Sequence, residues 1–551
     1  MSVSPAEGSE STDPPLFSVV TPVFDPPVPV LREAIDSVLA QTHADWELVL
    51  VDDHSTDEAV RRTLREYALR DGRITVIERA TNGHIVAASN DGLTAARGEF
   101  IVLLDHDDVL VPTALERNAR VIAEDPAVDY VYSDEDLIAP DGTYYGAFAK
   151  PDWSPERLRG QNYCCHVSVL RASLVREVGG FRPGFEGSQD HDLILRVTER
   201  ARRIVHLPEV LYHWRVSPKS AAADPDAKPY ALEAGRRAVQ EHLDRTGILG
   251  EVSVGPHGRY VISRQLPAER RVSIVIPTIG SGGLIWGEQR CFVTEAVRSA
   301  LAHTEHENLE VVVVYDAPTP TSVLDELAGI AGDRLVLVPF LEPFNYSRKV
   351  NLGVLASTGD RLILLNDDTE VRSSRWVEEL VAPLEEPDVG ATGAKLFFSD
   401  TTLQHAGIAA SNGEFRHPYR RSLEETPGKA GMLLINREVT GVTGACLAIR
   451  RDLFLDLGGL CEQLPHSFND VDFSYKVRAS GHRIVALASC ELFHFESQTR
   501  EPVRRPWEMR FVRNRWGAAG RDAYTPEYPE LPPPPGKAPR STAVGGAPVG
   551  S

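Results

Sequence analysis

The sequence predicts two α/β domains in tandem, each built on a mostly parallel β-sheet that is covered by helices. Three observations support this prediction: short β-rich runs alternate with helical patterns, acidic residues follow several of these runs, and the same order of features occurs twice along the 551 residues. Strands that alternate with helices are typical of a sheet with helices on both faces. Ligands of such sheets bind beyond the carboxyl ends of the strands, where these acids cluster.

Each copy opens with a strand and a helix. Phe17–Pro22 and Val272–Pro277 are short β-rich runs that reach a proline, which is typical of a buried strand that enters a loop. The apolar residues that follow are spaced so that they share one face of a helix. These residues are Leu31, Ile35, Val38 and Leu39 in the first copy and Val293, Val297 and Leu301 in the second.

The second predicted strand of each copy ends in acid, namely Asp52 and Asp53 in the first copy and Asp316 in the second. Carboxylates accept hydrogen bonds from imide N–H groups and from hydroxyl groups, so these residues are candidates for binding a nucleotide base or ribose. A helix N-cap at Ser55 or Thr56 is a second interpretation of the first segment, and it is compatible with the nucleotide role.

More acids follow the strand at 101–104, where Asp105 and Asp107 stand two residues apart. Carboxylates packed together repel one another unless a cation neutralises them. Hard oxygen ligands favour Mg²⁺ or Mn²⁺, and substrate phosphates complete such a half-open site. A solvated acidic turn is an equally weighted interpretation. In the second copy Asp368 aligns with Asp107, and Asn366 replaces Asp105.

A pair of acids also begins a helical pattern in each copy, at 189–192 and again at 469–472, each after a Gly-Gly turn. Asp190 and Asp470 at these helix starts are candidates for a general base toward a sugar hydroxyl. The alternative is an acid that complements the helix dipole. That alternative is favoured for one isolated motif, but the recurrence of the motif favours the general base.

A histidine follows each of these aspartates, His213 after 23 residues and His494 after 24. A single histidine among aromatic residues is usually packed in the core. Because the two histidines are in register, a metal or phosphate role has about the same weight as packing.

The composition excludes several classes of protein. Lys plus Arg number 58 against 79 Asp plus Glu, and the resulting charge of −21 argues against nucleic acid as a partner. The six cysteines form no CxxC pair, which favours reduced thiols in the cytoplasm. No apolar run approaches the roughly 20 residues of a spanning helix, and residues 1–15 lack the features of a signal peptide.

These features predict five segments. Residues 1–15 form a disordered N-terminus, 16–225 the first domain, 226–269 a connector with a helix and a short hairpin, 270–520 the second domain, and 521–551 a Pro/Gly-rich disordered tail.

Both halves resemble the family 2 glycosyltransferases, which are inverting enzymes with the GT-A nucleotide-sugar fold. In the first half the resemblance rests on residues 51–57, 104–108, 150–155, 187–190 and 211–215. The second half resembles the branch that contains rhamnosyl- and galactofuranosyl-type enzymes. There the resemblance rests on residues 344–347, 365–371, 404–407, 442–446 and 468–472.

The resemblance implies three groups of site residues. Pro22, Asp52, Asp53, Asp316 and Asn345 would bind the donor nucleotide. Asp105, Asp107, Asp368, His213 and His494 would hold Mg²⁺ or Mn²⁺ at its diphosphate. Asp190 and Asp470 would deprotonate the acceptor hydroxyl. The second copy departs from the family where Asp316 stands in place of two acids and where Asn366 replaces an acid.

The resemblance therefore implies a cytoplasmic, metal-dependent enzyme that moves sugars from UDP-, dTDP- or GDP-linked donors to a glycan or a lipid-linked saccharide. A cell-envelope glycan such as O-antigen or capsule is the expected product, made by two active centres. One catalytic domain beside a glycan-binding or scaffolding module is the alternative. A sugar nucleotidyltransferase is less favoured, because residues 21–27 and 278–283 lack a Gly-rich phosphate loop with a basic residue.

Arginines concentrate near the end of the second predicted domain, in an otherwise acidic chain. Contact with a diphosphate, either of the donor or of a lipid-linked acceptor, is one interpretation, and it would bring the protein to the inner face of the plasma membrane. A solvated or ion-paired helical face has equal weight. The residues are Arg500, Arg504, Arg505, Arg510, Arg513 and Arg515.

Overall fold

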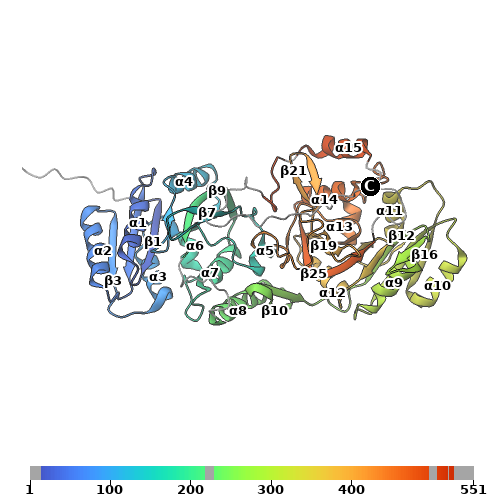
Figure 1. The fold of residues 1–551 in the computed structure, drawn as a ribbon, viewed down its shortest axis with the longest axis horizontal. Helices are drawn as coiled ribbons and strands as arrows, with labels where there is room; N and C mark the ends of the chain where they lie inside the picture. The colour runs from blue at the N-terminus through green and yellow to red at the C-terminus, as the bar shows by residue number, and fades with distance from the viewer. Residues whose placement is uncertain (1–13, 217–228, 496–504, 519, 527–551) are drawn as a thin grey trace, which may run out of the picture. The chain divides into compact units, whose positions relative to one another are not determined.

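The computed structural model describes residues 14–216, 229–495, 505–518 and 520–526, which divide into two compact units (Figure 1). The first unit contains residues 14–150 and 164–216, and the second contains 151–163 and the described residues from 230 onward. The chain thus enters the second unit at Pro151 and returns to the first at Cys164. Residues 1–13, most of the predicted tail, Arg500 and Arg504 lie outside the described residues.

The first unit is built on a nine-stranded sheet with the order β3-β2-β1-β4-β8-β6-β9-β5, and β7 pairs with β6. The strands from β3 to β4 are parallel, and β8 is antiparallel to both of its neighbours. The strands are β1 (Phe17–Val23), β2 (Trp46–Asp52), β3 (Ile74–Glu78), β4 (Phe100–Leu103), β5 (Val109–Leu110), β6 (Val128–Ile138), β7 (Tyr144–Phe148), β8 (Ser168–Arg171) and β9 (Arg203–Arg215). The helices are α1 (Val28–Leu39), α2 (Glu58–Arg70), α3 (His84–Ala95), α4 (Ala114–Glu124), α6 (Ala172–Glu177) and α7 (Gln189–Thr198).

The second unit repeats this order as β16-β15-β12-β17-β24-β19-β25-β18. In addition, β20 pairs with β19 and β23 pairs with β25. Its main strands are β12 (Val272–Thr278), β15 (Leu309–Asp316), β16 (Leu335–Phe340), β17 (Arg361–Leu365), β18 (Thr369–Val371), β19 (Val389–Phe397), β20 (Leu403–His405), β23 (Arg437–Glu438), β24 (Cys446–Arg450) and β25 (Arg483–His494). Its helices are α9 (Phe292–Ala302), α10 (Thr321–Ala331), α11 (Tyr346–Ala356), α12 (Trp376–Val381), α13 (Arg451–Asp456), α14 (Asn469–Ala479) and α15 (Pro506–Trp516). The identical strand order confirms the predicted duplication and α/β class.

Smaller elements complete the second unit. They are α5 (Pro155–Gly160), α8 (Pro229–Thr246), and the hairpins β10 (Gly250–Val254) with β11 (Tyr260–Arg264), β13 (Gly282–Ile285) with β14 (Glu288–Cys291), and β21 (Ala409–Ser411) with β22 (Glu414–Arg416). The region predicted as a connector thus contains a helix and a hairpin, and clusters with the second unit from Tyr230 onward. No helix among the described residues is long and apolar enough to cross a membrane.

The duplication extends to individual hydrogen bonds. The Asn90 amide of α3 both donates to and accepts from the backbone of Phe181, at 2.8 and 2.9 Å. The Asn351 amide of α11 makes the same pair of bonds with the backbone of Leu460, at 3.0 and 2.9 Å. Each bond pair ties a helix under the parallel strands to the Gly-Gly turn that leads toward α7 or α14. Asn90 and Asn351, and the Gly-Gly turns that they hold, therefore have the same structural role in the two copies.

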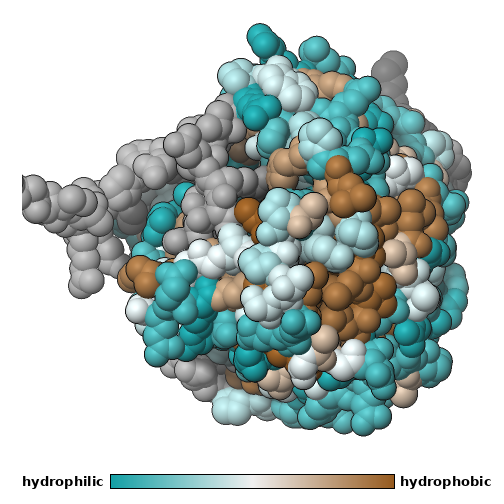
Figure 2. Space-filling model, turned by 90° about the vertical axis from the view of Figure 1, so that its right-hand side faces the viewer, coloured by the Kyte–Doolittle hydropathy of each residue, from teal (hydrophilic) through white to brown (hydrophobic). Residues whose placement is uncertain are grey.

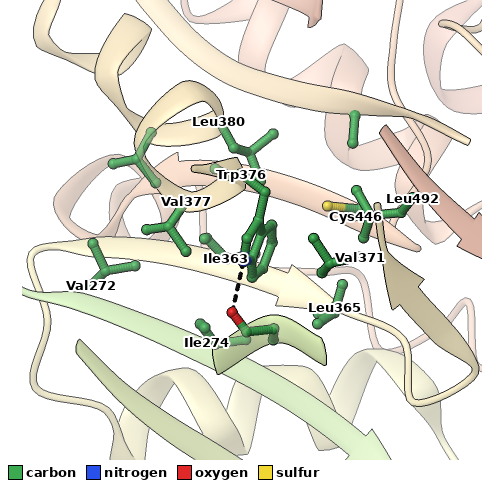
Figure 3. Packing of buried hydrophobic residues seen from close by; sticks show 14 of the residues in the cluster. Val272, Ile274, Ile363, Leu365, Val371, Trp376, Val377, Leu380, Cys446 and Leu492 are labelled. Atoms are coloured by element: carbon green, nitrogen blue, oxygen red, sulfur yellow. Dashed lines mark hydrogen bonds between the residues drawn. The ribbon is translucent and has the colours of Figure 1, made fainter. Parts of the chain in front are cut away.

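The core of the second unit lies between the sheet and helices α9, α10 and α12. Trp376 fills its centre and is fully buried, and its indole N–H donates to the Ala300 carbonyl at 2.9 Å (Figure 3). Aliphatic side chains from β12, β17 and β25 surround the ring. The outer surface at the end formed by α9, α10 and β16 carries an apolar patch among hydrophilic residues (Figure 2).

A buried ion-pair network holds α5 in the second unit. Glu156 is 2.6 Å from Arg264 and 2.9 Å from Arg159, and both arginines also pair with Glu386 at 2.9 and 2.8 Å. Burial opposes the charge of Glu156, but Arg264 and Arg159 outweigh this effect and hold the pKa of its carboxyl well below the usual range. These pairs join segments more than 100 residues apart in the chain.

We expect Glu156→Gln to lower the free energy of unfolding of the second unit by about 3 kcal/mol, because it leaves two buried guanidinium groups with less compensating charge. Chemical denaturation of the full chain, followed by circular dichroism, measures this change. The control is Glu233→Gln, which alters an exposed ion pair with Arg236 on α8 and should leave stability unchanged.

The stability difference between wild type and Glu156→Gln should depend on pH. Because the folded-state pKa of Glu156 is lowered, its stabilising contribution is present above the ordinary glutamate pKa of 4.5 and is lost as the pH falls below it. The stability difference between wild type and Glu156→Gln should therefore shrink on acidification below that value. A difference that is absent at neutral pH would contradict the assigned role of the network.

Candidate functional site

The candidate site of the first unit lies at the carboxyl ends of three adjacent parallel strands. Pro22 of β1 is in register with Val51 of β2, and β4 pairs with the other edge of β1. Asp52 therefore ends one neighbouring strand, while Asp105 follows the other. The Pro22 carbonyl lies 3.1 Å from Nδ1 of His106.

The two acids after β2 have different partners. Asp52 is buried, and its carboxylate accepts the backbone N–H of Ser55 at 3.0 Å. Asp53 forms an ion pair with Arg79 and accepts the N–H of Gly83 at 2.9 Å. The N-cap of α2 is Asp57, so neither Ser55 nor Thr56 caps this helix.

Three carboxylates crowd the turn after β4. Burial, and then the charges of Asp105 and Asp107, raise the pKa of Asp108 well above its usual value. The Tyr212 hydroxyl donates to Asp108 at 2.6 Å, and the backbone N–H of Arg215 donates to it at 2.7 Å. Burial also raises the pKa of Asp107, to which the charge of Asp105 adds.

A metal-binding geometry is present within this group. Asp105, Asp108 and His166 each offer a ligand atom, and these atoms lie within 4.8 Å of one another. His213 instead bonds through Nδ1 to Asp136, and its ring lies 4.2 Å from that of Tyr144.

The sequence did not predict His166 as a site residue, because the candidate residues were those that recur in both copies. Arg171 of β8 and Arg450 of β24 are equivalent, because each pairs with the first residue of β4 or β17. His166 and Ala445 each stand five residues before that arginine, so Ala445 takes the position of His166 in the second copy. Strand pairing also shows that Asp108 is the equivalent of Asp368, because the next residue in each copy pairs with His213 or His494. The register of β4 on β1 and of β17 on β12 instead matches Asp368 with Asp107, in agreement with the sequence, so the first copy has one more residue in this turn.

In the second unit His494 is held from both sides. Its Nδ1 lies 2.7 Å from the Gln404 amide oxygen, and the Gln404 amide nitrogen donates to the His494 carbonyl at 3.1 Å. This amide orientation requires a proton on Nδ1. The Nε2 atom consequently faces Asp368 at 3.1 Å and the Asn366 amide at 3.3 Å.

Hydrogen bonds connect this group to the predicted base of the second copy. Asp470 accepts the N–H of Gly444 at 3.2 Å, and the Gly444 carbonyl accepts from the Tyr346 hydroxyl at 3.1 Å. The Tyr346 hydroxyl also lies 3.0 Å from the side-chain oxygen of Asn366. The structure therefore brings Asp470, Asp368 and His494 into one network.

A buried ammonium group replaces part of the acidic charge in the second unit. Lys349 lies 3.1 Å from Asp316 and donates to the Thr278 carbonyl at 2.7 Å. Burial lowers the pKa of Lys349, although Asp316 opposes the shift. Burial and the neighbouring Asp368 raise the pKa of Asp367 to about 7.

Asn345 lies at the N-cap of α11, where its amide oxygen accepts the N–H of Arg348 at 3.1 Å. Its amide nitrogen donates to the Glu462 carbonyl at 2.8 Å. The Asn345 side chain therefore fixes the first turn of α11, which begins with Tyr346.

The two acids at each helix start have separate environments. Asp192 is fully buried and pairs with Arg196, and Asp472 is fully buried and accepts the indole N–H of Trp516 at 2.8 Å. Asp190 and Asp470, two residues earlier, are only half-buried. The second acid of each pair therefore anchors the helix, while the first reaches a partly exposed position.

Asp190 interacts electrostatically with Cys165, the residue before His166. Burial raises the pKa of the Cys165 thiol well above its usual value, and the charges of Glu135 and Asp190 add to this shift. Cys165 directly precedes His166, so the predicted base lies beside the segment that carries this candidate ligand.

Two of the three arginines on α15 are paired with acids, and Arg510 is exposed. Arg513 pairs with Glu414, and Arg515 lies 3.2 Å from Asp472.

Comparison with known proteins gives the family of the chain. The model of the family described as Glycosyl transferase family 2 matches residues 18–177 and 273–458. The protein belongs to glycosyltransferase family 2. Each matched region corresponds to one α/β sheet, so the predicted fold class of two GT-A domains in tandem is confirmed.

Two relatives match most of the chain. The protein y4gI of Sinorhizobium fredii is 42% identical over 91% of this chain and 56% of its own length. The O-antigen biosynthesis protein RfbC of Myxococcus xanthus is 37% identical over 88% of this chain and 38% of its own length. The chain thus spans about half or less of these relatives. Among solved structures, S. aureus TarS 1–349 has a TM-score of 0.34 at 20% identity, over 41% of this chain and 65% of that one.

The contacts of Gln404 predict the tautomer of His494. In wild type, ¹⁵N NMR of histidine-labelled protein should show a protonated Nδ1, because the Gln404 amide oxygen accepts a hydrogen bond from it. Gln404→Ala should give a mixture of tautomers, while Gln463→Ala, a change at an exposed glutamine, should not. A protonated Nδ1 that persists unchanged in Gln404→Ala would contradict this role.

Proposed function

We propose that the protein is an inverting, metal-dependent glycosyltransferase with two active centres, which transfers sugars from nucleotide-diphosphate donors to a growing cell-envelope glycan. The observation that carries this proposal is the network in which Asp470 is linked through Gly444 and Tyr346 to the Asn366, Asp368 and His494 group. The O-antigen role named for the Myxococcus relative supports the type of product.

Asp190 and Asp470 act as the general bases in this proposal. Both oxygens of Asp470 are oriented by backbone donors, since Oδ2 accepts from Gly444 and Oδ1 accepts from Val471 at 2.8 Å. A carboxylate oxygen has two lone pairs, so each can still accept the proton of an acceptor hydroxyl. The deprotonated oxygen would then attack the anomeric carbon from the side opposite the leaving diphosphate, which inverts that centre.

The donor set in the first unit fits Mg²⁺ or Mn²⁺. Asp105, Asp108 and His166 supply carboxylate and imidazole ligands, with Asp107 alongside. The raised pKa values of Asp107 and Asp108 reflect a concentration of buried negative charge that a cation neutralises. When bound, the metal would offset the charge that develops on the leaving nucleoside diphosphate. In the second unit Asp368 and His494 would hold it.

The nucleotide would lie at the ends of β2 and β15. Asp52 and Asp53 are the proposed contacts in the first unit, together with the Pro22 backbone. In the second unit Asp316 is the proposed contact, and Asn345 positions α11 beside it. Asp53 and Asp316 each pair with a cation, Arg79 or Lys349, which fixes their orientation.

A single catalytic domain with a glycan-binding partner domain is the second candidate. The observation in its favour is that Asn366 and the Lys349–Asp316 pair reduce the acidic charge of the second site. Substitution of one base at a time distinguishes the two functions.

If both centres work, Asp190→Asn and Asp470→Asn should each remove one linkage and lower that transfer about 100-fold or more, since general-base catalysis contributes at least this much. A panel of UDP-, dTDP- and GDP-sugars with Mn²⁺, scored by diphosphate release and by mass spectrometry of the products, measures the effect. The control Asp45→Asn, at a partly exposed loop residue, should leave both linkages intact. An unchanged product profile for either base variant would leave only one active centre.

The metal ligands are tested by Mn²⁺ binding, measured by calorimetry. His166→Ala should weaken binding at the first centre at least tenfold, because His166 belongs to the group with Asp105 and Asp108. His213→Ala is the matched control and should have the smaller effect, since His213 bonds to Asp136. A larger loss in His213→Ala would return the ligand role to His213.

A further inference from the structure

The second unit carries an exposed indole at the tip of a hairpin. Trp286 connects β13 to β14, and 47% of its surface is exposed. This hairpin lies between β12 and α9. In the first unit the equivalent connection, from β1 to α1, is only the four residues 24–27. The indole therefore belongs to an insertion that distinguishes the second copy from the first.

The backbone at Trp286 has an unfavourable conformation for its residue type. Trp286 and Gly287 form a two-residue turn with φ values of 51° and 83°. Positive φ at both positions defines a type I′ turn, in which Asn or Gly is strongly preferred at the first position. A bulky residue there costs free energy, so local preference does not account for the tryptophan.

Contacts on two sides fix the orientation of the ring. The indole N–H donates to Glu370 at 2.8 Å. The rings of Phe493 and Phe495 lie 4.9 and 5.6 Å from the indole, at interplanar angles of 82° and 79°. An exposed ring that is already held in place loses little conformational entropy when a ligand packs on it.

The indole lies beside the second candidate centre. Phe493 and Phe495 flank His494, and Glu370 pairs with Phe493 in the ladder of β18 and β25. Successive side chains of a strand point to opposite faces, so Trp286 lies across β25 from the His494 imidazole. The indole is therefore close to the strand end that carries His494, but on the face of the sheet where Phe493 and Phe495 pack with Ile285 and Phe292 at the start of α9.

We propose that Trp286 is the platform of a sugar-binding subsite near the second centre, on which the C–H face of a neutral sugar ring packs while Glu370 accepts its hydroxyls. The amphipathic indole and the adjacent carboxylate match the apolar and polar groups of a sugar. Arg372, which packs over the same Phe493 ring, is neutralised by its ion pair with Glu424, and this favours a neutral sugar over an anionic one. A role of this subsite in sugar transfer rests on the proposed function of the second centre.

Saturation-transfer NMR on the full chain tests the platform, with the methyl glycosides of glucose, galactose, mannose and rhamnose as probes. Trp286→Asn removes the ring and supplies a residue that the type I′ turn prefers, so we expect its melting temperature to stay within a few degrees of wild type. We expect the transfer signal of at least one glycoside to fall at least fivefold. Glu370→Ala, which leaves the ring in place but loosens it, should give a smaller loss.

Two controls separate this site from the rest of the protein. Trp507→Ala removes a tryptophan of similar exposure, 41%, on α15 and should retain the signal. Asp470→Asn should retain glycoside binding even where it abolishes transfer, so failure of the proposed catalytic function is distinguishable from failure of the platform. An undiminished signal in Trp286→Asn, or no signal for any glycoside in wild type, would overturn the proposal. A Trp286-dependent signal for UDP alone would assign the ring to a nucleotide and also overturn it.

Discussion

Neutralisation of buried acid at the strand ends is the constraint that shapes both sites. Parallel strands bring their carboxyl ends to one edge of the sheet, and Asp105, Asp107 and Asp108 gather there at partial or full burial. Burial and mutual repulsion disfavour their charged forms. Hydrogen bonds from the Tyr212 hydroxyl and the Arg215 backbone stabilise Asp108. The negative charge that these bonds leave uncompensated is of the kind that a divalent cation bound by Asp105, Asp108 and His166 would neutralise.

The second copy meets the same constraint with different residues. Asn366 stands where the first copy has a carboxylate, and the Lys349 ammonium lies between Asp316 and the Thr278 carbonyl. At the equivalent position of α3 the first copy has a buried alanine, Ala88. Duplication has thus preserved the strand order and the helix-to-turn bonds, while the charge at the strand ends has changed. If both proposed centres are active, this difference in charge favours different donors or acceptors.

Periodicity and repetition predicted the features that both copies share. The alternation of strands with helices, the acids at the strand ends and the duplication itself follow from such patterns. Features present in only one copy left no repeat to detect, and His166, opposite Ala445, is the clearest case. Residues 151–163 belong to the second unit rather than to the predicted first domain. Ion pairs with distant segments hold them there, and no local sequence pattern encodes such pairs.

Burial distinguishes two acids that the sequence presents as equals. Asp192 and Asp472 are fully buried against cationic or indole donors, so their charge fixes the first turn of α7 and α14. Each therefore holds the half-buried aspartate two residues earlier at a defined place beside the strand ends. The general-base role proposed for these aspartates requires hydrogen-bonding reach to a proton, and a helix anchored by a buried ion pair or hydrogen bond provides that rigidity better than a loop does. Under that proposal one acid of each pair meets a structural requirement and the other a chemical one, which explains why both recur in each copy.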